Sequence, residues 1–179
     1  EGAGLTPLSQ AAHQTILVAG YPGLAFLGDD HWILSRLKPL GFEKVNHVIT
    51  LRQRGRWSVR SGPPGLQLRQ ATAADLDDVT RLDHAAFPSL WWYSHKVLRR
   101  ALDASCCFHV AYLQGQCVGY QFSTVRQGHA HIVRLATHPQ WGQRGIGARL
   151  LSEALLALDP AHSVTLNTPQ DNLASLRLY

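Results

Sequence analysis

The segment His131–Leu151 has residue types and spacing that can hold an anion. An apolar, β-prone run ends at Pro139, a short polar turn follows, and Gly145-Ile-Gly147 opens directly into an amphipathic stretch. Glycines let the backbone approach a phosphate closely, and the free N–H groups of a first helical turn point at it. Most strand–loop–helix units bind nothing, but Arg144 adds a cation here. Neither common nucleotide fingerprint, Gly-x-Gly-x-x-Gly or Gly-x-x-x-x-Gly-Lys-Ser/Thr, is present.

Two motifs of this chain resemble signatures of the GNAT acyltransferase superfamily. The stretch Pro139–Gly147 resembles its acyl-CoA loop, Gln/Arg-x-x-Gly-x-Gly/Ala, with Gly142 where Gln or Arg is usual and Gln143 beside it. The stretch Asn172–Tyr179 is similar to the second signature, Asn-x-x-Ala/Ser-x-x-Leu/Phe-Tyr. Upstream, Leu68–Leu76 is similar to the opening strand and capped helix of the family. The resemblance spans residues 66–179.

This resemblance implies an α+β fold, an α/β sandwich whose mixed central sheet is flanked by helices. It implies an acetyl-CoA-dependent N-acetyltransferase, in which a primary amine of a small molecule or peptide attacks the thioester directly. Acetyl-CoA is then the cosubstrate. The alternative, from a different class of protein, is a non-catalytic module that binds CoA or has a structural role.

The resemblance also assigns roles to residues of the site. In the family the pantetheine arm pairs like an extra strand with the strand before the glycine loop, here the main chain of Leu135, Ala136 and Thr137. The residues expected to cradle the pyrophosphate are Gln143, Arg144, Gly145, Ile146, Gly147 and Ala148. Asn172 and Ser175 of the second signature are expected to bind the cofactor, and Tyr179 is expected to protonate the thiolate. A tyrosine near a helix end is otherwise a packing residue, and Asn172 is also a good helix cap.

The candidate general base and the candidate binding surface for the acceptor amine are each predicted from one feature of the sequence. His131 stands where some family members place a glutamate, and a neutral imidazole can take a proton near pH 7. The competing interpretation is a structural histidine at the end of a strand, whose ring nitrogens are hydrogen-bonded and take no part in catalysis. In the loop 87–93, the rings of Trp91, Trp92 and Tyr93 could attract an amine through their aromatic faces. Alternatively, two of the three rings fill the core.

Composition narrows the class of protein. The chain has 179 residues, 45% hydrophobic and 16% charged, enough for one globular domain or one domain and part of another. No run is long enough to cross a membrane, and no basic run is interleaved with aromatics as in nucleic-acid-binding proteins. The net charge of +5 indicates a basic soluble surface or attraction to CoA phosphates. The three cysteines do not form a disulfide framework, which predicts a reducing cytoplasm. No Cys, Asp or Glu accompanies the histidines at the spacing of metal ligands, which predicts that the protein has no metal site.

Periodicity and turn residues predict the elements that must position these groups. Ser61–Gly65, with two prolines, is a linker or wide turn. We expect a strand at 66–70, and a helix capped by Thr72 that runs to Ala86. A second helix at 94–102 and three strands at 106–113, 117–125 and 129–137 follow, the first two joined by a tight turn at 114–116. A helix at 145–158, a strand at 163–167 and a helix from 171 complete the pattern.

The first 60 residues predict a separate segment. We expect a strand at 15–19, a helix at 31–40 and a strand at 45–51. Arg36–Phe42, ending Leu-Gly-Phe, resembles the segment that follows the tyrosine in the same superfamily. Residues 14–52 therefore resemble the back half of a degenerate GNAT repeat, with Asp30 in place of Asn172 and Leu37 in place of Tyr179.

The predicted domains are a structural half at 1–60, a linker at 61–65 and a GNAT domain at 66–179 that stops before its own Leu-Gly-Phe and final strand. Alternatively, residues 14–52 pack on the main domain and supply the strands that it lacks; both interpretations can hold at once. An exposed sheet edge in a half domain would aggregate, so it is expected to pair within the chain or in a homodimer.

Overall fold

A computed structural model of the chain describes residues 5–20, 24–28, 31–53, 58–158 and 163–179. The chain divides into two compact units, residues 1–46 and residues 47–179. The first unit contains the helices α1 (Leu5–Val18) and α2 (His31–Leu37) and the 3₁₀ turn η1 (Lys38–Leu40). Gly41 ends this turn with φ 85° and donates its N–H to the carbonyl of Lys38, which accounts for the glycine of Leu-Gly-Phe.

One expected element of the first unit is wrong. The sequence predicted a strand at 15–19, whereas residues up to Val18 lie in α1. The β-branched run is short, and Leu5, Leu8, Ala12 and Ile16 recur at helical spacing across it. The expected helix at 31–40 is confirmed as α2 and η1. Asp30, predicted to replace Asn172, lies outside the described residues.

The second unit is built on a mixed six-stranded sheet with the order β1-β6-β5-β4-β3-β2. Its strands are β1 (Val48–Gln53), β2 (Gln67–Gln70), β3 (Cys107–Leu113), β4 (Gln116–Arg126), β5 (His129–Thr137) and β6 (Ser163–Pro169). All neighbours are antiparallel except β5 and β6, which are parallel. The turn between β3 and β4 is tight, because Gln114 and Gly115 both take positive φ.

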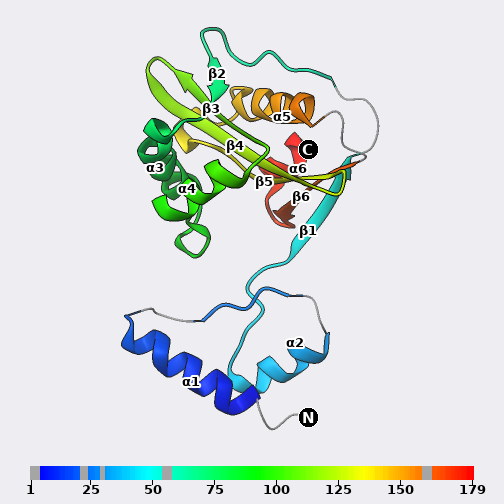
Figure 1. Cartoon of the computed structure of the whole chain (residues 1–179). Coiled ribbons are helices and arrows are strands. Elements are labelled where there is room, and N and C mark those ends of the chain that lie inside the picture. Colours follow the sequence, from blue (N-terminus) through cyan, green and yellow to red (C-terminus); the bar gives the residue numbers. More distant parts are fainter. Residues whose placement is uncertain (1–4, 21–23, 29–30, 54–57, 159–162) are drawn as a thin grey trace. The chain divides into compact units, whose positions relative to one another are not determined.

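Helices cover both faces of this sheet (Figure 1). The elements η2 (Ala73–Asp75), α3 (Leu76–Ala86), η3 (Ser89–Trp91) and α4 (His95–Ala104) follow β2, and η4 (Pro139–Trp141), α5 (Ile146–Ala157) and α6 (Leu173–Leu178) follow β5 and β6. One core lies between α3, α4 and the sheet and includes Leu82, Leu98 and Phe122. The opposite core lies under α5 and includes Ile132, Leu155 and Leu166. The α+β fold expected from the sequence is confirmed.

The strand β1 closes the sheet beside β6. The two strands pair from Val48↔Pro169 to Gln53↔Val164, and the Thr50 hydroxyl donates to the Asn167 side chain at 2.9 Å. The expected strand at 45–51 thus begins and ends slightly later, and it lies in the sheet of the second unit. The segment 48–53 therefore supplies an edge strand to the main sheet.

Candidate active site

Strand β5 separates from β6 halfway along its length. The two strands are paired from His129↔Ser163 to Ile132↔Leu166, and β5 has no register partner on β6 beyond that point in the described chain. On its other side, β4 pairs Ser123 with Ile132 and Phe122 with Arg134, so Val133 is an extra residue, a β-bulge. The bulge turns the strand away from β6. An open strand edge at 133–137 can accept an extended ligand as an additional strand.

The glycine loop follows this open edge after the 3₁₀ turn η4. Gln143 and Gly145 take positive φ of 58° and 83°, and the N–H of Arg149 donates to the carbonyl of Gly145 at 3.0 Å as the first bond of α5. The N–H groups of the preceding helical residues, up to Ala148, have no helical carbonyl to bond and favour an anion. At Gly147 a Cβ would lie 3.4 Å from Thr137 Oγ1 and 3.3 Å from Leu178 Cδ2, so the glycine keeps the helix close to β5.

Arginine side chains surround a hollow beside the loop. A cavity of about 500 Å³ is lined by Arg60, Arg144 and Arg177 together with Gly145 and Ala148. Within the described residues none of these arginines forms an ion pair, and the Arg144 guanidinium lies 4.8 Å from the centroid of the Trp141 ring. Sequence reasoning found Arg144 and missed the other two arginines. The position of Arg177 between Asn172 and Tyr179 was an available signal; Arg60, just before the predicted linker 61–65, had none.

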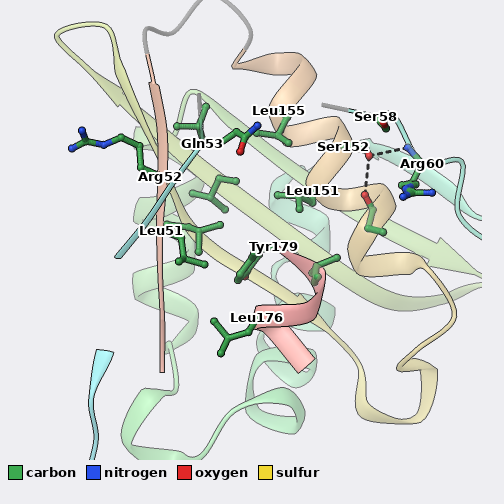
Figure 2. Close-up of a pocket in the computed structure, with 15 residues that line it drawn as sticks. Leu51, Arg52, Gln53, Ser58, Arg60, Leu151, Ser152, Leu155, Leu176 and Tyr179 are labelled. Atoms are coloured by element: carbon green, nitrogen blue, oxygen red, sulfur yellow. Dashed lines mark hydrogen bonds between the residues drawn. The ribbon is translucent and has the colours of Figure 1, made fainter. Parts of the chain in front are cut away.

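Tyr179 lies at the edge of a second, more apolar cavity. This cavity, of about 570 Å³, lies among α5, α6, β6 and β1, and Figure 2 shows Tyr179, Leu176, Leu151 and Leu51 around it. The Ser152 hydroxyl accepts the backbone N–H of Arg60 and donates to the Ala148 carbonyl, both at 2.9 Å, and so fixes the chain at Arg60 against α5. The tyrosine packs on the core under α5, and burial raises the pKa of its phenol. The phenol, already protonated at neutral pH at its ordinary pKa, thereby becomes a weaker acid.

His131 lies on the other face of the sheet. Its Nδ1 is 2.9 Å from the hydroxyl oxygen of Thr165, whose strand neighbours Val164 and Leu166 point into the core that Tyr179 contacts. Because side chains alternate along a strand, His131 and Tyr179 face opposite sides of the sheet. Burial lowers the pKa of His131, so the imidazole is neutral near pH 7. The structure does not bring these two predicted catalytic side chains together on one face.

The remaining predicted cofactor ligands lie at the start of α6. The Asn172 side-chain carbonyl accepts the Ser175 N–H at 3.1 Å and caps this helix. The main chain of Leu135, Ala136 and Thr137 lies on the stretch of β5 beyond its pairing with β6. The open edge of β5 and the glycine loop thus follow one another along the chain, and the role of these residues in holding a cofactor stays a prediction.

The aromatic loop between α3 and α4 divides into packed and exposed rings. Tyr93 packs against the core under α3 and α4, 6.2 Å from the Phe122 ring between centroids. Trp92 is 46% exposed, stacks on His84 at 4.4 Å between centroids, and donates its indole N–H to the Phe87 carbonyl at 2.7 Å. Trp91 is partly buried. Of the predicted acceptor rings, Trp92 is the one open to solvent.

In the part of the chain that the structure describes, no three His, Cys, Asp or Glu side chains are arranged to hold a metal ion. None of the helices described is both long and apolar enough to cross a membrane.

Comparison with known proteins places this geometry in a family. The model of the acetyltransferase (GNAT) family matches residues 71–179. A protein named N-alpha-acetyltransferase from Sulfolobus acidocaldarius is 29% identical over 130 residues, 63% of this chain and 76% of that protein. A homologous protein of the same name from Sulfurisphaera tokodaii is 24% identical over 128 residues, 63% of this chain and 76% of that protein.

Solved structures share the fold. The PaiA N-acetyltransferase of Thermoplasma acidophilum in complex with coenzyme A has a TM-score of 0.58 and 17% identity, covering 64% of this chain and 86% of that one. A GCN5-related N-acetyltransferase from Sphaerobacter thermophilus has a TM-score of 0.62 and 18% identity, covering 82% of this chain and 50% of that one. Because the family model covers more than half of the sequence and includes both the glycine loop and Tyr179, the chain belongs to the GNAT family of acetyltransferases.

Proposed function

We propose that this chain is an acetyl-CoA-dependent N-acetyltransferase whose acceptor is the α-amino group of a peptide or protein. The observation that carries the proposal is the separation of β5 from β6 at Ile132, directly ahead of a glycine loop that opens α5. The relatives named N-alpha-acetyltransferase support the choice of acceptor. A cytoplasmic location and a homodimer remain predictions from the sequence.

The residues present fit the cofactor by chemistry and by space. The free N–H groups at the start of α5 and the side chain of Arg144 suit a pyrophosphate. Gly147 lets the start of α5 pack close to β5, since a Cβ there would lie 3.4 Å from Thr137 Oγ1. The open edge of Leu135–Thr137 suits the two amides of a pantetheine arm. Asn172 and Ser175, at the start of α6, are the residues of the second signature that we expect to bind the same cofactor.

In the proposed reaction the amine nitrogen attacks the thioester carbonyl, the C–S bond breaks, and acetyl is transferred. Binding both reactants side by side supplies much of the acceleration, because attack becomes effectively unimolecular. His131, neutral at pH 7, takes the proton that the amine loses. Tyr179, whose phenol is protonated at neutral pH, gives its proton to the departing thiolate. The amine would approach from the α3–α4 face, which also carries His131 and the loop 87–93.

A non-catalytic CoA-binding module is the second candidate, and one observation favours it. Tyr179 packs against the apolar core under α5, on the face of the sheet opposite to His131. If neither side chain reaches the thioester, the chain would bind the cofactor without turnover.

Two measurements separate the candidates. Calorimetry with CoA tests the cofactor site, where the proposal expects one site per chain. An acetylation screen over peptides with free α-amino groups, polyamines and aminoglycosides tests turnover and acceptor class. Acetylated peptide α-amines support the proposal; CoA binding without turnover on any acceptor supports the module; no CoA binding by the folded chain refutes both.

A further inference from the structure

A buried ion pair lies under the aromatic loop between α3 and α4. Asp83, in the last turn of α3, is fully buried, and the side chain of Arg134, on β5, is 9% exposed. The Arg134 Nε and Nη2 donate to the same Asp83 oxygen, Oδ2, at 2.9 and 2.7 Å. The Tyr120 hydroxyl also donates to this oxygen, so Asp83 Oδ2 accepts three hydrogen bonds.

Both members of the pair also hold the loop. The Arg134 Nη2 donates to the Trp91 carbonyl at 2.6 Å, and the Tyr93 N–H donates to Asp83 Oδ1 at 2.8 Å. The guanidinium lies 3.5 Å from the centroid of the Phe87 ring and 4.2 Å from that of Tyr93. The loop is therefore fixed near its start, its middle and its end by one buried pair.

The position of Arg134 connects this loop to the cofactor strand. Arg134 directly follows the bulge residue Val133, at which β5 turns away from β6. The same strand segment that would align the thioester thus also carries the cation that holds the loop. If the loop moved relative to β5, the buried guanidinium of Arg134 would lose its hydrogen bond to the Trp91 carbonyl, and little water could reach the guanidinium to replace that bond.

Stability alone gives a weak reason for such a pair. Removing two charges from water is costly, and replacing a buried pair with apolar residues of similar volume is commonly neutral or stabilising. We propose that Asp83 and Arg134 are positioning residues, which hold the loop 87–93 at a fixed place relative to β5 and thereby determine how the acceptor amine is presented to the thioester. This inference rests on the proposed function and names residues that neither family signature contains.

The test compares a double variant with the wild-type chain. Asp83→Leu combined with Arg134→Met removes both charges while keeping an apolar fill, so folding can be retained while the tether is lost. The control is Asp103→Asn, which removes the charge of an exposed aspartate 3.4 Å from Arg99 on α4. The readouts are kcat and KM for the acceptor peptide, the Kd for CoA, and the hydrogen exchange of the Tyr93 amide.

We expect the double variant to lose about 100-fold in acceptor kcat/KM, the scale of a misplacement near 1 Å, with an unchanged Kd for CoA. The Tyr93 amide should exchange at least about tenfold faster, because its charged acceptor is gone, while the Leu98 amide in α4 keeps its protection. The Asp103→Asn control should match the wild type in every readout.

Wild-type acceptor kinetics in a folded double variant, or an unchanged Tyr93 exchange rate, would overturn the inference. If the double variant does not fold, Arg134→Lys decides, because lysine keeps the charge but lacks the planar fork that reaches Asp83 and the Trp91 carbonyl together. Absence of acetylation by the wild-type chain would instead refute the proposed function, and the Tyr93 exchange rate would still test the tether.

Discussion

Reversing the charge of Arg144 tests the glycine loop as the pyrophosphate site. Arg144 is exposed, lies beside the N-terminus of α5 and shares its hollow with Arg60 and Arg177. Two unit charges 4 Å apart in water interact by about 1 kcal/mol. Arg144→Glu removes one favourable interaction of this size and adds an unfavourable one, about 2 kcal/mol together. We therefore expect the Kd for CoA to rise about 30-fold.

The control for this variant is Arg126→Glu, which changes the net charge by the same amount. Arg126 lies at the far end of the β4–β5 hairpin, opposite His129, so eight strand residues, or roughly 25 Å, separate it from the glycine loop. Calorimetry at low salt and at about 1 M salt, where the Debye length is near 3 Å, separates local from long-range effects. Equal weakening by both variants, or none by Arg144→Glu, would refute this assignment of the loop.

Four further outcomes are expected. Tyr179→Phe should lower turnover by roughly 10²- to 10⁴-fold while the Kd for CoA holds; unchanged turnover would remove Tyr179 from the mechanism. Because burial lowers the pKa of His131, the acidic limb of the kcat/KM profile should lie below pH 6.5 and vanish in His131→Gln; a limb that persists would identify another base. The hydrogen bond from Arg69 holds the pKa of Asp75 far below its unfolded value near 3.9, so its stabilisation is present above about pH 4 and is lost as the pH falls further. Urea unfolding at pH 7 and pH 3 should show a smaller difference for Asp75→Asn than for the wild type, and equal differences would contradict this. Deleting residues 1–46 should leave a soluble second unit, whereas deleting residues 1–53 should expose the edge of β6 and cause association that light scattering detects. Equal behaviour of the two variants would show that β1 does not protect that edge.

Local patterns were sufficient for most elements of the second unit. The strand at 129–137 and the helix that follows the glycine loop were predicted from apolar runs bounded by Pro139 and Gly145, and both lie where expected. The Thr72 cap and the turn at Gln114–Gly115 were equally local signals, since one or two residues determine each. The helix α1 was missed because a short β-branched run outweighed the longer helical period around it.

Features that depend on distant residues were not predictable. The bulge at Val133 appears only in the register between β4 and β5, and no residue type marks it. The pairing of Asp83 with Arg134 joins residues from α3 and β5, and neither side chain has a local signal for burial. Likewise, the opposite faces of His131 and Tyr179 follow from where α6 packs, which the asparagine–tyrosine spacing does not determine.

The pairing of β1 with β6 has a consequence for how the chain folds. Thr50 bonds Asn167, 117 residues further along the sequence, so this pair of strands closes one of the longest loops in the molecule. Contacts of such large sequence separation form late, because the entropy of loop closure must be met before they contribute. During synthesis β1 leaves the ribosome before β6 and has no strand to pair with until β6 has also been synthesised. The hairpins β3–β4 and β4–β5 can form first, and the pairing of β6 with β5 and β1 is completed last.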